Sequence, residues 1–128
     1  MRLLSIMAAS VFCVLTGTGL SKPASAQAKP MAYAIVEVDA SDRDGFLKDY
    51  LPKGFAAITG AGGRFIVRGG QIATIEGEAP KPRVLLVQFE SLEKAKAAFA
   101  TPEYAEARKI GDKYAKFRIF VVEGVPPQ

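Results

Sequence analysis

Arg83-Val-Leu-Leu-Val-Gln-Phe89 is a near-continuous run of apolar residues that ends at Glu90-Ser91. The run is too short for an ordinary helix and has the usual length of a β-strand. Its apolar residues are adjacent instead of alternating with polar ones, which is typical of a strand that is covered on both faces. We therefore expect residues 83–89 to form a buried β-strand.

Three other segments are rich in β-branched and aromatic residues and are predicted strands: Tyr33-Ala-Ile-Val-Glu-Val38, Arg64-Phe-Ile-Val-Arg68 and Phe117-Arg-Ile-Phe-Val-Val-Glu123. Gly69-Gly70 is typical of a two-residue hairpin turn, and it predicts a return strand over Gln71-Ile-Ala-Thr-Ile75. Residues 76–82 are then expected to form a polar, proline-containing loop.

Two helical regions are predicted between these strands. The first covers residues 41–60, and Pro52 must kink or split it because proline has no N–H to donate to the carbonyl four residues back. The second is a helix over 91–99 followed by another over 101–116, which crosses Gly111 at a cost of about 1 kcal/mol.

The order β-α-β-β-α-β predicts an α+β protein with the ferredoxin-like plan and one small extra hairpin. Both helical regions would lie on one face of the sheet. The strands carry apolar residues on both faces, so the second face also needs a cover, and the chain has no segment left to supply it. We therefore expect a homodimer in which two sheets pack face to face.

Residues 1–26 have the features of a secretory signal peptide. A positively charged start is followed by an apolar run from Leu3 to Leu15 and by the small-residue exit Ala24-Ser25-Ala26. The run is too short to span a bilayer, so no stable membrane anchor should remain after cleavage. We expect cleavage after Ala26 and a periplasmic or secreted protein, with a tether over 27–31 and one domain over 32–126.

The composition of the mature chain excludes several kinds of chemistry. It has no His, Trp or Asn, and its only Cys, Cys13, lies in the leader. The strong ligands of zinc and haem are therefore missing, and we expect neither a metal site nor a cofactor. Removal of Arg2 and Lys22 leaves 15 basic and 13 acidic residues, a net charge of +2 without a basic patch, so nucleic acid is not an expected partner.

The chain resembles the domain of unknown function 1330 family of the dimeric α/β-barrel superfamily. The most specific segment is Gly62-Gly-Arg-Phe-Ile-Val-Arg-Gly-Gly70. Supporting segments are residues 33–38 and 83–89, Thr101-Pro-Glu-Tyr104 and Val121-Val-Glu-Gly124. The resemblance implies a homodimer whose two four-stranded sheets form a barrel. Members of the superfamily include cofactor-free oxygenases and haem-processing proteins.

The chain departs from this family pattern at two positions. Ala98 followed by Phe99 stands where the family usually has an aromatic residue, often Trp, before the Thr-Pro-Glu-Tyr segment. Gly111 stands where the last helix often carries an Arg. A family activity that depends on those side chains would be changed or lost in this chain.

Arg64 and Arg68 are the first candidate ligand-binding residues, because side chains four apart on a strand point to the same face. They would form a two-guanidinium clamp for a carboxylate or an enolate, or they would only pair with nearby glutamates. Glu37 would act as a base beside them or form a plain ion pair. Tyr33 and Tyr104 would either donate to a ligand or be buried aromatics with a hydroxyl at the surface.

Two functional hypotheses follow from these residues. The first is an exported homodimer that binds a small anionic or aromatic molecule. The second is a cofactor-free enzyme, oxygenase- or isomerase-like, that acts on a small aromatic or carbonyl compound. The missing His, Asn and Trp favour the binding protein, because they remove common proton-transfer and oxyanion-stabilising groups.

Overall fold

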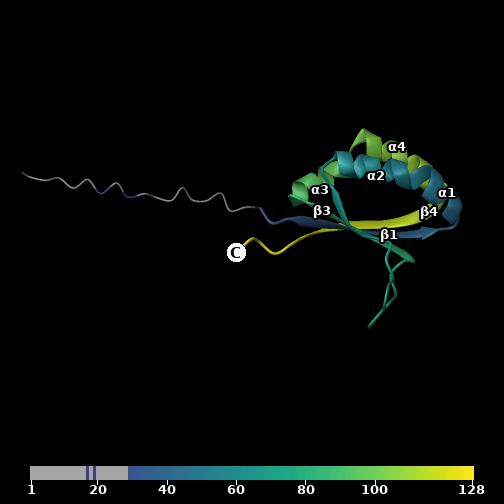
Figure 1. Ribbon diagram of the computed structural model, residues 1–128, viewed down its shortest axis with the longest axis horizontal. Helices are drawn as coiled ribbons and strands as arrows, with labels where there is room; N and C mark the ends of the chain where they lie inside the picture. The colour runs from purple at the N-terminus through teal and green to yellow at the C-terminus, as the bar shows by residue number, and fades with distance from the viewer. Residues whose placement is uncertain (1–16, 18, 20–28) are drawn as a thin grey trace, which may run out of the picture.

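The computed structural model describes residues 17, 19 and 29–128 and contains one antiparallel sheet in the order β2-β3-β1-β4 (Figure 1). The strands are β1 (Ala32–Ala40), β2 (Arg64–Arg68), β3 (Arg83–Phe89) and β4 (Ala115–Glu123). All four predicted strands that flank the helical regions are thus present. With helices between β1 and β2 and between β3 and β4, the topology is ferredoxin-like and the class is α+β. The predicted leader with its cleavage site at Ala26 lies outside the described residues, apart from positions 17 and 19.

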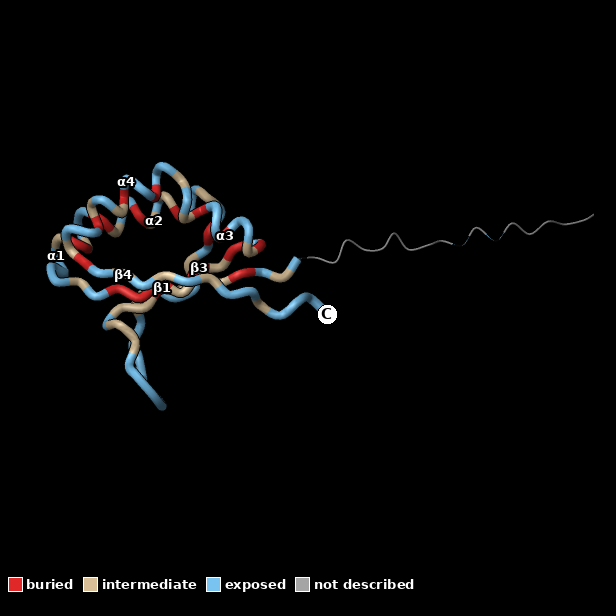
Figure 2. Tube along the Cα trace, turned by 180° about the vertical axis from the view of Figure 1, so that it is seen from behind, coloured by how far each residue is buried: buried red, intermediate tan, exposed pale blue. Residues whose placement is uncertain are grey.

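The helices all cover one face of the sheet, and buried residues lie where the two layers meet (Figures 1 and 2). They are α1 (Arg43–Gly45), the π-helical turn η1 (Phe46–Tyr50), α2 (Leu51–Gly60), α3 (Leu92–Ala98) and α4 (Pro102–Gly111). Phe46, Phe89, Val38 and Val87 are the largest fully buried side chains. None of the helices in this part of the chain is long and apolar enough to cross a membrane.

The helical hydrogen bonding changes just before Pro52, where an irregularity was predicted, but the helical region continues without a gap from Arg43 to Gly60. The turn before Pro52 widens into a π-helix, and the Leu51 N–H donates to the carbonyl of Phe46, five residues back. Pro52 directly follows this wide turn and has no N–H to donate, so the π-helical turn accommodates the proline within the helical region. The wide turn brings the Tyr50 side chain into the core, where it is 6% exposed.

The prediction that the last helix reaches Lys116 is wrong. Helix α4 ends at Gly111, and the following turn is closed by the Tyr114 N–H, which donates to the Gly111 carbonyl over 3.0 Å. Ala115 already pairs with Ala40 at the start of β4. Pairing with β1 therefore overrides helix propensity over these residues.

The predicted extra hairpin is also wrong. A type I′ turn needs a positive φ at both central residues, and here Gly69 has φ +67° whereas Gly70 is not in the left-handed region. The Gly69 N–H instead donates to the Val84 carbonyl and continues the pairing of β2 with β3. Residues 71–75 form no strand, and the segment over 69–82 leaves the sheet on the side opposite the helices (Figure 1). We call this segment the arm.

The sheet has a second, open face that no element of the described chain covers. Residues of β1, β3 and β4 that alternate with the core positions lie on it, among them Ile35, Leu86, Phe120 and Val122. Phe120 is 44% exposed and Val122 is 50% exposed. The open face therefore carries the expected apolar residues, together with charged residues such as Glu37 and Arg118.

Candidate functional site

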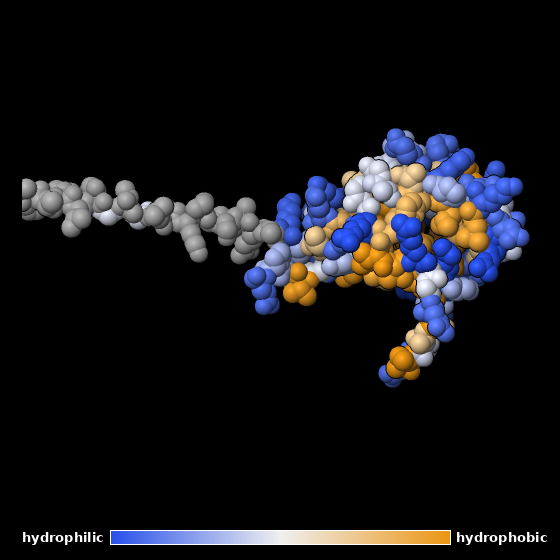
Figure 3. Space-filling model, viewed as in Figure 1, coloured by the Kyte–Doolittle hydropathy of each residue, from blue (hydrophilic) through white to orange (hydrophobic). Residues whose placement is uncertain are grey.

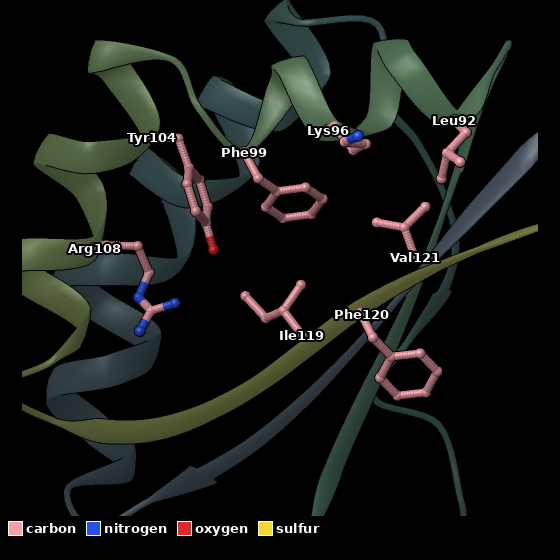
Figure 4. A pocket seen from close by; sticks show the side chains of 8 residues that line it. All are labelled: Leu92, Lys96, Phe99, Tyr104, Arg108, Ile119, Phe120 and Val121. Carbon is pink, nitrogen blue, oxygen red and sulfur yellow. The ribbon is translucent and has the colours of Figure 1, made fainter.

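The candidate site is a broadly open cavity of about 530 Å³ between the helical layer and the edge strand β4 (Figure 4). Its walls are mainly apolar and come from α3, α4 and β4. The lining residues are Leu92, Lys96, Phe99, Tyr104, Arg108, Ile119, Phe120 and Val121. The volume lies within the usual range for a small-molecule site, as does the combination of apolar walls with a few polar groups.

Helix α4 places Tyr104 and Arg108 in the cavity. The helix starts at Thr101, whose Oγ1 accepts from the Tyr104 N–H over 3.2 Å and donates to the Ala98 carbonyl over 3.1 Å. Pro102 suits the first helical position because its φ is already helical. Tyr104 and Arg108 are four residues apart and therefore lie on the same side of the helix. In Figure 4 both side chains point from α4 toward the strand residue Ile119.

Arg108 is the strongest anion-binding group of the cavity. Its guanidinium lies 3.9 Å from the centre of the Phe117 ring, and one terminal nitrogen donates to Asp112 Oδ1 over 2.9 Å. Burial lowers the pKa of Arg108, but interactions with Asp112 and Tyr104 outweigh burial and raise it overall, so the group stays charged. Its Nε is buried and has no hydrogen-bond partner among the described residues.

Tyr104 connects the cavity to the aromatic core. It is 6% exposed, and its ring packs edge-on against Phe99 with centroids 5.0 Å apart. Behind it lies Tyr50, whose pKa is raised far above the ordinary phenol value, first by burial and then by the neighbouring Tyr104. Burial therefore favours the neutral phenol form of Tyr50.

Of the residues predicted from the sequence, Tyr104 is the one that lines the cavity. Arg64 and Arg68 do not form the predicted clamp. A β-bulge lies between Phe65 and Val67, so Arg64 pairs with Gln88 whereas Arg68 pairs with Leu85. Gln88 and Leu85 lie on opposite faces of β3, and the two arginines therefore do so as well.

Arg68 lies on the helix side, where its guanidinium stacks 3.9 Å from the centre of the Phe55 ring. The exposed Arg64 lies on the open face. Tyr33 is also on the open face, half-buried against Gly124. The structure thus does not bring these three residues together.

Glu37 is a buried carboxylate on the open face, with 4% of its surface exposed. Its Oε2 accepts from Arg118 over 2.9 Å, and its Oε1 accepts from the backbone N–H of Lys81 over 3.1 Å. It contacts neither Arg64 nor the cavity beneath the helices. Glu37 therefore forms an ion pair and a loop contact instead of acting as a base beside the arginines.

Arg108 and Lys96 were missed at the sequence level, although Arg108 left a signal. Tyr104, Ala107 and Gly111 form the buried stripe of α4, and Arg108 adjoins this stripe. An arginine at the border of an apolar helix stripe indicates a cation held close to the core. Lys96 is exposed on α3 and left no comparable signal.

The departures at Ala98 and Gly111 have a structural explanation. Ala98 is buried in the core, and the next residue, Phe99, supplies an aromatic ring to the cavity. A Cβ at Gly111 would lie 2.7 Å from Cδ2 of Tyr50, so glycine lets the Tyr50 ring approach α4 closely. Arg108, one turn earlier, places a guanidinium on this helix.

The cavity can hold a small molecule with an apolar body and an anionic or phenolic group. Lys96 and Arg108 supply positive charge, Tyr104 supplies a hydroxyl, and the lining has no acidic side chain. Among the residues that the structure describes, no three His, Cys, Asp or Glu side chains are grouped so that they could hold a metal ion.

Similar structures share the fold at low sequence identity. A protein of unknown function from Rhodopseudomonas palustris matches with a TM-score of 0.60 and 15% identity, over 77% of this chain and 85% of that one. A hypothetical protein from Arabidopsis thaliana matches with a TM-score of 0.54 and 15% identity, over 78% and 92%. SnoaB, a cofactor-independent oxygenase from Streptomyces nogalater, matches with a TM-score of 0.52 and 9% identity, over 77% and 96%.

No curated protein matches the chain. The family described as a domain of unknown function (DUF1330) matches residues 31–125. This range includes all four strands and all the helices described above. The chain therefore belongs to the DUF1330 family.

Proposed function

We propose that the mature chain is an exported homodimer that binds a small aromatic carboxylate, or a similar amphipathic anion, in the cavity beneath α3 and α4. The observation that carries this proposal is the position of Tyr104 and Arg108 on one wall of an otherwise apolar cavity (Figure 4). A carboxylate would bind to Arg108 and Lys96, and an aromatic ring would pack against Phe99 and the β4 side chains.

The charge of Arg108 is only partly compensated inside the protein. Asp112 occupies one terminal nitrogen, and this carboxylate has an exposed side chain, 61% accessible. The remaining donors of the guanidinium fork are suited to a planar carboxylate. An anion in the cavity would therefore gain a charge-assisted hydrogen bond, a type that contributes about 1.5–3 kcal/mol.

Isothermal titration with benzoate, 4-hydroxybenzoate and 1-naphthoate tests this site. We expect binding by the native protein and a loss of at least tenfold in affinity in Arg108→Met, which removes the guanidinium but keeps an unbranched apolar side chain at this position. Arg64→Gln is the matched control, because it removes an exposed guanidinium on the open face. Equal losses in both variants, or no binding by the native protein, would contradict the proposed site.

The apolar open face supports the homodimer. The four strands are 5 to 9 residues long and cover roughly 400–500 Å² at ordinary strand rise and spacing, an area in the upper part of the range for an exposed patch on a monomer. Pairing two such faces, with contributions from edges and loops, would bury roughly 1,200–2,000 Å² in total. Light scattering after gel filtration tests this, and a monomer mass that persists over a tenfold rise in concentration would contradict it.

Export rests on the signal-like features of residues 1–26. The test is expression of the full chain in a bacterium, followed by mass determination of the accumulated protein. We expect the mass of a chain that begins at Gln27, and we expect this protein to be recovered from the periplasm or the medium. A protein that keeps its leader and stays in the cytoplasm would contradict export.

A cofactor-free enzyme is the second candidate function. The observation that favours it is that Tyr104 and Arg108 are neighbouring donors at a largely apolar cavity, where they would stabilise the oxyanion of a phenolate or an enolate. Oxygen uptake with hydroquinones and other phenols tests it. We expect Tyr104→Phe to reduce any turnover by about 100-fold, since one oxyanion donor contributes on that order. Binding without turnover would leave the binding protein as the function.

A further inference from the structure

The arm, residues 69–82, is the part of the described chain that projects farthest from the sheet (Figure 1). It leaves on the side of the open face and is exposed throughout residues 71–79. Ile75 is 93% exposed, and apolar surface is visible near the end of the arm (Figure 3). Ile75 is not part of the core, so the rest of the described chain does not explain an apolar side chain at this exposed position.

The root of the arm is held in place by Glu37 and by strand pairing. Gly69 extends β2 by one hydrogen bond, from its N–H to the Val84 carbonyl over 2.8 Å. On the returning side, the Lys81 N–H donates to Glu37, which is itself paired with Arg118. A buried carboxylate thus fixes the point where the arm rejoins the sheet. From there the arm projects outward on the side of the open face (Figure 1).

A groove of about 480 Å³ lies in the corner between the arm and the open face. Its walls are apolar except for Glu37 and Gln71. The side chains that form it include Ile35, Val67, Ile72, Val84 and Phe120. The groove is continuous with the open face, so whatever covers this face also reaches the arm.

We propose that each arm grips the second copy of the chain along the outer edge of that copy's β4. This inference rests on the proposed homodimer. From Gly70 to Ile75 the chain reaches up to about 17–20 Å, whereas two packed sheets lie about 10 Å apart. An arm of this length cannot end between the sheets and must pass the edge of the facing one.

The order and direction of the outer strands determine which edge of the second copy the arm passes. β2 and β4 are the outer strands, and they run in opposite directions because each neighbouring pair in the sheet is antiparallel. A twofold axis along the strands places β2 of one copy beside β4 of the other and leaves neither edge free. The arm continues from β2, and it therefore runs beside β4 of the second copy.

Charge supports the same arrangement. The arm carries Glu76 and Glu78, and the exposed Lys116 lies on the open side of β4 together with Arg118, which is already paired with Glu37 of its own chain. Both basic residues lie near the arm end of the sheet, because Arg83 and Phe117 both pair with Val38. A twofold axis parallel to the strands places the arm end of one sheet next to the arm end of the other. The acidic arm would therefore meet this basic end of the second copy.

Sedimentation measurements of the dimer dissociation constant test the arm. We expect Ile75→Ser to raise this constant roughly 100-fold, because the substitution removes a buried Ile side chain twice in a symmetric dimer. Val125→Ser is the matched control, since Val125 is 81% exposed but lies outside the arm. Far-UV circular dichroism should be unchanged, because the arm makes no core contact.

Cysteine cross-linking tests the position of the arm directly, because the mature chain has no cysteine. A mixture of the Ile75→Cys and Lys116→Cys chains should form a mixed disulfide under mild oxidation, and a mixture of Ile75→Cys with Lys53→Cys on α2 should not. A stable dimer whose dissociation constant is unchanged by Ile75→Ser, and which gives no mixed disulfide, overturns the arm proposal and leaves the dimer intact. A wild-type chain that stays monomeric overturns both.

Discussion

Replacing Gly111 by Ala should destabilise the protein, although alanine is the better helix former. Tyr50 lies against two glycines: a Cβ at Gly111 would lie 2.7 Å from its Cδ2, and a Cβ at Gly54 would lie 2.8 Å from its Cζ. Cβ contacts this short force a neighbour to move. Tyr50 is 6% exposed and packs edge-on against Phe117 at 5.2 Å, so its ring has little room to move.

The size of the effect follows from two opposing contributions. Helix propensity favours Gly111→Ala by at most about 1 kcal/mol, because Gly111 is the last residue of α4. Overpacking a filled core costs about 1–3 kcal/mol. Gly60→Ala is the matched control, because Gly60 is the last residue of α2 and a Cβ there would meet nothing within 4 Å. The free energy of unfolding of Gly111→Ala should therefore lie about 1–3 kcal/mol below that of Gly60→Ala.

Urea unfolding at one fixed protein concentration measures this difference without a contribution from dimer dissociation that varies between samples. In thermal unfolding, 1 kcal/mol corresponds to about 4–8 °C for a domain of this size. Tyr50→Leu should remove the clash, so Gly111→Ala should be nearly neutral in that background. Two results would contradict this reasoning: equal stability of Gly111→Ala and Gly60→Ala, or the same destabilisation by Gly111→Ala in the Tyr50→Leu background as in the native chain. Either result would mean that the close approach of Tyr50 to α4 is not the reason for glycine at position 111.

Three further predictions concern Tyr50, Arg68 and Thr101. Burial raises the pKa of Tyr50 above its unfolded value of about 10, so the contribution of Tyr50 to stability is complete below pH 10 and is lost as the pH rises further, by up to about 1.4 kcal/mol per pH unit. The free energy of unfolding of Tyr50→Phe should therefore depend less on pH above about pH 10 than that of the native chain. Arg68→Ala should lower the free energy of unfolding by about 0.5–1 kcal/mol through its lost stacking on Phe55, and titration calorimetry should find carboxylate binding unchanged. Thr101→Ala should lower the free energy of unfolding measured in urea by about 1 kcal/mol, because it removes the hydrogen bond that caps α4. It should also weaken ligand binding, because the first turn of α4 holds Tyr104; unchanged affinity would mean that the cap does not position the site.

The strands could be predicted because their local preference and their tertiary role agree. Residues 64–68 and 83–89 are β-branched or apolar in sequence, and both segments form strands with those bounds. At the helix boundary at Gly111 and at the missing hairpin, local preference and tertiary role disagree. Gly69-Gly70 satisfies a local rule for a turn, but the pairing of Gly69 with Val84 decides the direction of the chain.

The candidate site was less predictable, because it depends on which face each strand residue takes. The prediction of a clamp by Arg64 and Arg68 relied on strict alternation over five residues, and the bulge between Phe65 and Val67 reverses that alternation for every residue after it. No pattern in Arg64-Phe-Ile-Val-Arg68 indicates a bulge. Tyr104 lies on α4, which begins after Thr101 as the sequence indicates, and its side chain lines the cavity, whereas its role in ligand binding stays a prediction.

The bulge separates Arg64 from Arg68, which the sequence analysis had placed together as one anion-binding clamp. By moving Arg68 to the helix side, it turns this arginine into a stacking partner for Phe55 and leaves Arg64 alone on the open face. The basic charge that a ligand would meet then comes from α3 and α4, through Lys96 and Arg108. In the function that we propose, the helical layer carries ligand binding, and the open face with its arm serves association. Substitutions at Arg108 and at Ile75 should therefore be separable, each affecting one property while the other is retained.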